Sequence, residues 1–139
     1  MDKKYNWAIL GCGKIARKFV ADLSLLPNAN RYAAASRSLD NAKGFAEELG
    51  FEKAYGSYQE MVEDPNVDIV YIATPHAKHL EHSLLCLQNK KAVLCEKAFA
   101  MNTKEVDQMI AASKSNNTFL MEAFWTIFSA KFKKGFRTG

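Results

Sequence analysis

Three small residues near the start of the chain have the spacing of a phosphate-binding loop. Residues 11–16 read Gly-Cys-Gly-Lys-Ile-Ala, directly after an apolar run at 7–10 and directly before a helical pattern. The first glycine allows a tight turn, the second lets a pyrophosphate approach the backbone, and the small sixth residue lets the helix pack closely on the strand. The start of the helix adds unpaired N–H groups and the positive end of its dipole. We therefore predict that a dinucleotide is bound by Gly11, Cys12, Gly13, Lys14, Ile15 and Ala16.

This loop leaves two alternatives open. The glycines could form a purely structural turn, since a single Gly-x-Gly-x-x-Ala motif is weak by itself. Cys12 could be a redox-sensitive thiol at the start of a helix, or simply a tolerated variable position.

A second candidate group follows the apolar run at 32–35 and consists of Ser36, Arg37 and Ser38. About 20 residues past the glycine loop, enzymes that use NAD usually have an acidic residue that binds the ribose 2′-hydroxyl. A guanidinium group at this place can pair with a 2′-phosphate and stack on the adenine, and the two hydroxyls can donate further hydrogen bonds. The motif therefore predicts NADP in preference to NAD. In the alternative interpretation, Arg37 is a surface residue over the adenine and both cofactors bind.

Two more segments with polar side chains follow the apolar runs at 69–73 and 92–95. Open parallel sheets bind their ligands at the carboxyl ends of the strands. A lysine next to a glutamate at such an edge can orient a substrate hydroxyl and assist proton transfer. The candidate residues are Thr74, Pro75, His76, His79, Glu96 and Lys97.

His76, His79 and His82 are spaced three apart on a segment predicted to be helical. No acidic residue or cysteine completes a convincing set of metal ligands, so we predict no metal site. We expect His76 to contact the ligand near the helix start and His82 to lie on the solvated face.

The apolar runs alternate with helical patterns, which predicts an α/β fold of the Rossmann type: a doubly wound parallel sheet of about six strands in one domain spanning 1–122. The runs are continuously apolar, as expected for strands that are covered on both faces. The helical faces are predicted from spacings of three and four residues. The predicted strands are 7–10, 32–35, 69–73, 92–95 and 118–121. The predicted buried faces include Ile15, Phe19, Leu23 and Leu26, then Ala42, Phe45, Ala46 and Leu49, then Leu80, Leu84 and Leu87, and finally Val106, Met109 and Ile110. The predicted helix caps are Ser57 with Glu60 and Asn102 with Glu105.

Taken together and in this order, the motifs resemble the glucose–fructose oxidoreductase, inositol dehydrogenase and MocA (Gfo/Idh/MocA) family, and within it the members similar to dihydrodiol dehydrogenase. The resemblance extends to about residue 125 and is carried by the motifs at 11–16, 35–38, 73–75 with His79, 96–97 and 121–125. It implies hydride transfer between NADP and a hydroxyl of a sugar, cyclitol or diol. It makes Lys97 the catalytic lysine, places Thr74, Pro75 and His76 beside the nicotinamide ribose, and adds Trp125 to the cofactor contacts.

The composition is that of an ordinary globular domain. The chain has 139 residues, of which 48% are hydrophobic and 24% charged, so it can form one domain with a core. The net charge of +4 is spread along the chain, which argues against nucleic-acid binding. No apolar stretch is long enough for a signal peptide or a membrane span, and three cysteines without metal spacing favour a reducing compartment. We therefore expect a cytoplasmic protein with no membrane partner.

The resemblance also implies a second α/β domain, which in relatives forms the substrate wall and the oligomer contacts. Residues 123–139 are accordingly predicted to begin the connection to such a domain. We expect the chain alone to lack activity and the full protein to be a homo-oligomer that acts on a polyol or a sugar-like substrate. The alternative is a non-catalytic NADP-binding module that docks through its aromatic C-terminal segment.

Overall fold

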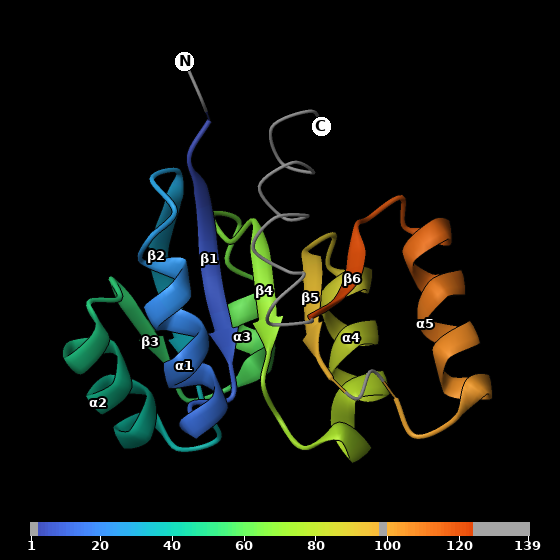
Figure 1. Cartoon of the computed structure of the whole chain (residues 1–139), viewed down its shortest axis with the longest axis horizontal. Coiled ribbons are helices and arrows are strands. Elements are labelled where there is room, and N and C mark those ends of the chain that lie inside the picture. The colour runs from blue at the N-terminus through green and yellow to red at the C-terminus, as the bar shows by residue number, and fades with distance from the viewer. Residues whose placement is uncertain (1–2, 98–99, 124–139) are drawn as a thin grey trace.

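A computed structural model describes residues 3–97 and 100–123 (Figure 1). Within these residues, six parallel strands form one sheet in the order β3-β2-β1-β4-β5-β6. This is the predicted Rossmann-type order, in which the chain winds outward from β1 in both directions. The strands are β1 (Tyr5–Leu10), β2 (Ala29–Ala35), β3 (Lys53–Tyr55), β4 (Ile69–Ile72), β5 (Ala92–Glu96) and β6 (Leu120–Ala123). The helices are α1 (Lys14–Leu23), α2 (Leu39–Leu49), α3 (Tyr58–Val62), the 3₁₀ helix η1 (His76–Lys78), α4 (His79–Gln88) and α5 (Thr103–Ser115).

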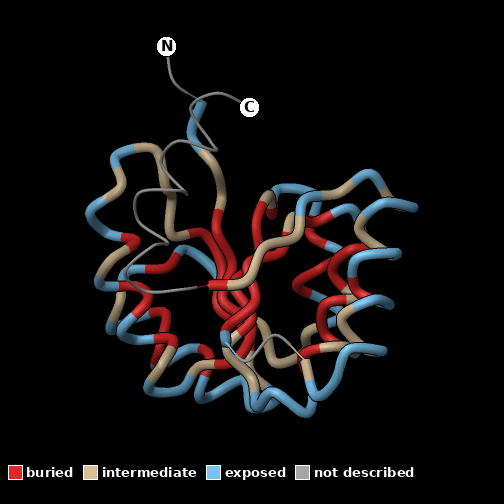
Figure 2. Tube along the Cα trace, turned by 45° about the vertical axis from the view of Figure 1, so that its right-hand side comes forward, coloured by how far each residue is buried: buried red, intermediate tan, exposed pale blue. Residues whose placement is uncertain are grey.

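The helices cover the two faces of the sheet and form two separate cores. Helices α1 and α2 pack on one face, where the largest buried side chains include Trp7, Phe19 and Tyr71. Helices α3, α4 and α5 pack on the other face. The central strands β1, β4 and β5 are therefore largely buried on both sides, as Figure 2 shows for the centre of the molecule. In the part of the chain that is described, no helix has the length and apolarity needed to cross a membrane.

Most of the predicted elements are confirmed. The five apolar runs coincide with β1, β2, β4, β5 and β6, although β6 begins two residues later than predicted. Ser57 caps α3 by accepting a hydrogen bond from the Glu60 N–H, and Asn102 caps α5 in the same way through Glu105. The strand β3 was not among the predicted runs, because it has only three residues and its Lys53 is exposed.

The predicted buried faces of two helices are partly wrong. In α5, Met109 is buried as predicted, but Ile110 is exposed. In α4, Leu87 alone of the three predicted leucines is buried. Leu80 and Leu84 are only half-buried, whereas His79, His82 and Ser83 are buried together with Cys86 and Leu87. Spacing rules count apolar residues and therefore miss a helix face on which polar side chains are buried. Here the two histidines are tolerated in the interior because Thr74, just past the end of β4, provides hydrogen-bond partners for both.

Asp64, between α3 and β4, is a buried carboxylate that connects three segments. It accepts hydrogen bonds from the hydroxyls of Tyr32 at 2.8 Å and Tyr55 at 2.6 Å, and from the N–H of Asn66 at 2.9 Å. Burial raises the pKa of Asp64, but these hydrogen bonds and the charge of Lys53 outweigh burial and hold the pKa below its ordinary value. The carboxylate is therefore ionised at neutral pH and ties β2 and β3 to the segment that leads into β4.

Asp64→Ala is expected to destabilise the protein, because two phenol hydroxyls lose their acceptor. Each buried group left without a partner costs about 1–3 kcal/mol, so urea unfolding at pH 7 should show a loss of roughly 2–4 kcal/mol. Because the pKa of Asp64 is lowered on folding, the difference between the two proteins should shrink as the pH falls below the ordinary carboxyl range. The exposed neighbouring change Glu63→Ala should have little effect, and an equal loss in both variants would contradict this role of Asp64.

Candidate functional site

The candidate residues gather at the carboxyl ends of the strands, around the point where the strand order reverses. From β1 the chain continues through α1 to β2 on one side, while β4 lies on the other side of β1. The loops after β1 and β4 therefore lead in opposite directions and leave a crevice between them. In open α/β sheets this crevice is the usual place for a ligand.

The glycine loop is held by the end of β2. The carbonyl of Ala35 accepts a hydrogen bond from the Gly11 N–H at 3.0 Å and from the Cys12 thiol at 3.4 Å. Gly13 is the N-cap of α1, and among the described residues no side chain caps this helix start. A Cβ at Gly13 would meet no described atom within 4 Å. The start of α1 thus has no side-chain cap and has room beside Gly13, as an anion-binding helix start requires.

Gly11 lies too close to the loop after β4 to carry a side chain. Its φ of +104° is unfavourable for residues other than glycine, and a Cβ there would come within 2.9 Å of the Thr74 Cγ2. The Ala73 N–H also donates to the Leu10 carbonyl at 2.9 Å. The loops after β1 and β4 are therefore in direct contact across the crevice, which only a glycine at position 11 permits.

Two adjoining pockets occupy the crevice and share Gly13, Ala73, Thr74 and Pro75. The Arg37 pocket, of about 580 Å³, is further lined by Gly11, Cys12, Ser36, Arg37, Tyr58, Ala77, Lys78, Glu81 and His82. The Lys97 pocket, of about 410 Å³, is further lined by Lys14, Ile15, His76, His79, Glu96 and Lys97. Ligand pockets in proteins typically enclose roughly 300–1,000 Å³, so the pair could hold an elongated ligand that passes over Gly13.

The Arg37 pocket is positioned by β2 and β3. The Ser36 N–H donates to the Tyr55 carbonyl at 3.1 Å, which fixes the chain just before Arg37. Ser38 does not line the pocket: its hydroxyl oxygen caps α2 by accepting from the Asn41 N–H at 3.3 Å. Asp40 lies in the first turn of α2. Arg37 is therefore presented at the pocket from the turn between β2 and α2.

The Lys97 pocket contains the carboxylate of Glu96, which is held by a hydrogen bond from a buried tyrosine. The Tyr71 hydroxyl on β4 donates to Glu96 Oε2 at the end of β5, and Phe19 of α1 stacks on the Tyr71 ring with centroids 3.8 Å apart. Burial raises the pKa of Tyr71, and the hydrogen bond to Glu96 and the charge of Glu96 raise it further, so the phenol stays a donor. The buried network thus fixes the direction of the Glu96 side chain.

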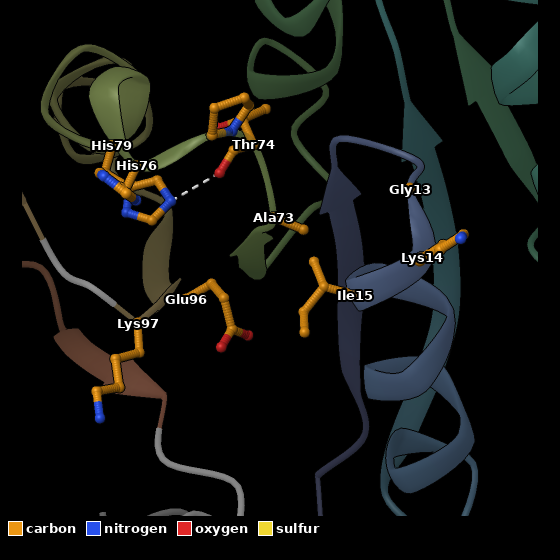
Figure 3. A pocket seen from close by; sticks show the side chains of 10 residues that line it. Gly13, Lys14, Ile15, Ala73, Thr74, His76, His79, Glu96 and Lys97 are labelled. Carbon is orange, nitrogen blue, oxygen red and sulfur yellow. Dashed lines mark hydrogen bonds between the residues drawn. The ribbon is translucent and has the colours of Figure 1, made fainter.

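Figure 3 shows how the side chains of the Lys97 pocket are arranged. Ile15 points toward Glu96, whereas the Lys14 ammonium points away from the pocket. Lys97 is exposed and follows Glu96 at the rim. The pocket therefore combines a fixed carboxylate with an exposed amine, a pair that can orient a hydroxyl and move its proton.

Thr74 is held from two sides by histidines of α4. Its carbonyl lies 2.8 Å from His79 Nε2, and its Oγ1 lies 2.8 Å from His82 Nδ1. The prediction that His82 lies on the solvated face is wrong: the residue is only 6% exposed, and its ring meets Tyr58 edge-on with centroids 4.9 Å apart. His76 is exposed in η1 and lines the Lys97 pocket.

Cys12 is half-buried in the loop, and its environment argues against a reactive thiol. Burial raises the pKa of Cys12 to about 11, with the nearby charge of Arg17 opposing the shift. The nucleophile and the oxidisable species is the thiolate, which is scarce at neutral pH when the pKa is so high. A redox role for Cys12 is therefore not supported.

The structure brings together most of the predicted site residues. Ala16 is fully buried and packs in the core beneath the loop instead of lining a pocket. Trp125 lies outside the described residues. Tyr58, Tyr71 and His82 were missed, because each contributes through a partner that is distant in sequence. The capping signal at Ser57 could have suggested that Tyr58 begins a helix near the crevice, but no sequence signal marked Tyr71.

Comparison with known proteins gives a family and several relatives. Residues 5–124 match GFO_IDH_MocA, described as an oxidoreductase family with an NAD-binding Rossmann fold. The trans-1,2-dihydrobenzene-1,2-diol dehydrogenase of Xenopus tropicalis is 46% identical over 125 residues, which cover 88% of this chain and 38% of that protein. The human protein of the same name is 45% identical over 88% of this chain and 37% of its own length. The chain thus spans less than two fifths of the length of these relatives.

Two solved structures extend the comparison. A 3-ketoreductase from Actinomadura kijaniata in complex with NADP and TDP-benzene has a TM-score of 0.82 and 30% identity, covering 86% of this chain and 37% of that one. A levoglucosan dehydrogenase in complex with NADH has a TM-score of 0.81 and 25% identity, covering 87% of this chain and 35% of that one. Similar domains therefore occur with either dinucleotide.

Two glycine substitutions should have opposite effects on stability. Gly11→Ala places a methyl group against Thr74 at a positive φ and should lower the free energy of unfolding by at least about 1 kcal/mol. Gly44→Ala lies on the exposed side of helix α2, where a Cβ meets no described atom within 4 Å, and should raise it by roughly 0.5–1 kcal/mol. Urea unfolding measures both. Equal effects in the two variants would contradict the close contact at Gly11.

Cys12 should react slowly with iodoacetamide at neutral pH. With a pKa of about 11, its thiolate fraction at pH 7.5 is on the order of 100-fold below that of an ordinary cysteine. We expect alkylation of the folded protein to be slower by about this factor than that of the unfolded protein, and its rate to keep rising up to pH 10. Comparison with Cys12→Ser identifies the part of the alkylation that occurs at Cys12. Rapid alkylation that levels off near pH 8 would restore the redox interpretation.

Proposed function

The chain belongs to the Gfo/Idh/MocA family of oxidoreductases, as its motifs predicted, and from this membership we propose that it binds NADP and presents it for hydride transfer to or from a hydroxyl-bearing carbon of a diol, cyclitol or sugar. One observation carries the proposal: the Arg37 and Lys97 pockets share Gly13, the residue at the start of α1, where no side chain caps the helix. A dinucleotide has the matching form, with two nucleosides linked by an anionic pyrophosphate.

The Arg37 pocket would take the adenosine half. The pyrophosphate would lie over Gly11 and Gly13 at the start of α1, which has no side-chain cap and leaves room beside Gly13. Arg37 would pair with the 2′-phosphate, and Ser36 lies beside it. Hydrogen bonds to charged groups contribute about 1.5–3 kcal/mol, which corresponds to roughly a ten- to hundredfold preference for NADP over NAD.

The Lys97 pocket would take the nicotinamide half. The dinucleotide, when bound, supplies or accepts the hydride. Thr74, Pro75 and His76 would border the nicotinamide ribose, with Trp125 as a further contact. Glu96, held by Tyr71, would orient the exposed Lys97, whose ammonium would donate to the substrate oxygen and assist the transfer of its proton.

The substrate class rests on the relatives. Proteins similar to this chain are named as a dehydrogenase of a dihydrobenzene diol and of levoglucosan and as a 3-ketoreductase. Each name indicates the interconversion of an alcohol and a carbonyl group. The identity of the substrate, the cytoplasmic location and the homo-oligomeric state stay predictions.

Arg37→Asp tests the choice of cofactor. The substitution replaces a partner for the 2′-phosphate by a carboxylate that repels it and can accept from a 2′-hydroxyl. Calorimetric titration at fixed salt should show NADP binding weakened by at least tenfold and NAD binding equal or tighter.

Lys43→Asp is the matched control, since it makes the same change of charge on an exposed side of α2 away from both pockets. It should leave both affinities within about twofold. Similar losses of NADP affinity in the two variants would reduce the role of Arg37 to long-range charge. Absence of binding of either dinucleotide to the wild-type chain would overturn the proposal.

A further inference from the structure

Thr74 lies where the two pockets meet, and the direction of its hydroxyl matters for any anion bound there. Its methyl group faces Gly11, and its residue lines both pockets. A hydroxyl can donate one hydrogen bond and accept others. Because Thr74 adjoins Gly11, the proposed pyrophosphate over Gly11 lies next to it, as does the nicotinamide ribose. A phosphate oxygen there gains a hydrogen bond from Thr74 only if the Thr74 proton points toward it.

The surroundings of His82 favour one direction for this proton. His82 Nε2 lies 3.9 Å from the carboxylate of Glu81, which favours the proton on Nε2. Nδ1 is then the acceptor, and the Thr74 hydroxyl donates to it across 2.8 Å. In this state the Thr74 proton is used inside the protein, and only lone pairs of its oxygen remain for a ligand.

The other neighbours of His82 decide how readily it takes up a second proton. Burial lowers the pKa of His82; Glu81 opposes this shift, while Lys78, His79 and Arg37 reinforce it. The edge of the ring packs against Tyr58 from α3. The pKa of His82 therefore lies below its ordinary value, and the ring is neutral at pH 7.

We propose that His82 is a positioning residue of the dinucleotide site, which sets the direction of the Thr74 hydroxyl and thereby couples the affinity for the dinucleotide to pH. This inference rests on the proposed function. When His82 is protonated, its Nδ1–H donates to Thr74 Oγ1, and the Thr74 hydroxyl turns its own proton toward the phosphate. The imidazolium adds a positive charge at the edge of the same pocket.

Linkage gives the sign of the effect. An anion that prefers protonated His82 raises the pKa of His82 when it binds. By reciprocity, the affinity for the anion rises as the pH falls through the pKa that His82 has in the complex. Couplings between sites commonly change affinity by fivefold or more. We therefore expect tighter NADP binding at pH 5.5 than at pH 7.5, beyond the change caused by other groups.

The experiment measures the dissociation constant of NADP by calorimetry from pH 5.5 to 8 for the wild-type 139-residue chain, His82→Asn and Thr74→Val. Asparagine can hydrogen-bond Thr74 in the place of Nδ1 but does not titrate. The titrations of His76, of His79 and of the 2′-phosphate are common to all three proteins. The ratio of the NADP affinities of the wild type and His82→Asn therefore isolates the contribution of His82 to the pH dependence. Circular dichroism at each pH checks folding, and His82→Gln is the second variant if His82→Asn does not fold.

The proposal expects the wild type to gain about fivefold or more in affinity over His82→Asn between pH 7.5 and 5.5, with Thr74→Val losing most of this gain. Parallel pH profiles for the wild type and His82→Asn would overturn the inference and leave the proposed function intact. If Thr74→Val kept the full gain in NADP affinity at low pH, the proposed action of His82 through the Thr74 hydroxyl would be overturned. A wild-type chain that binds NADP at no pH would overturn the proposed function and this inference together.

Discussion

Gly11 and Thr74 meet where the order of strands in the sheet reverses, and the site depends on this contact. If the two loops stood farther apart, the Arg37 and Lys97 pockets would open into one wide cleft and the start of α1 would not face a bounded space. The contact requires a residue without a side chain at a positive φ. The parallel sheet places the two loops at one edge, and the glycine lets them approach.

Local sequence was enough to predict the parts of the site whose function lies in the backbone. The loop at 11–16 has a fixed spacing because the turn, the anion approach and the helix packing each constrain one position. The central strands were predicted because strands buried on both faces are continuously apolar, as Ile69–Ile72 is. The caps at Ser57 and Asn102 are signals that span only three residues.

The interactions that the sequence could not reveal join residues that are distant in the chain or break the apolar pattern. The Tyr71 hydroxyl meets Glu96 across 25 positions, and neither residue carries a local signal of the contact. His79 and His82 occupy the buried face of α4, where periodicity predicted leucines. A polar group can be buried when its partner is present, and the partner, Thr74, follows another element. Such pairs become visible only when the fold has brought β4 and α4 together.

Each of the two pockets is lined by two cations and one carboxylate, but the pockets differ in which of these charges is buried. The Arg37 pocket is lined by the cations of Arg37 and Lys78, with Lys78 ion-paired to Glu81 at 3.7 Å. In the Lys97 pocket the buried ionisable side chains are His79 and Glu96, while the lysines there are exposed. A phosphate in contact with the Glu96 carboxylate would be repelled, whereas the ring of an oxidised nicotinamide carries a positive charge. Inside a protein, Coulomb interactions of this kind act over several ångströms. The buried Glu96 carboxylate thus supports the proposed direction of the dinucleotide, with its phosphates toward Arg37 and its reactive ring toward Lys97.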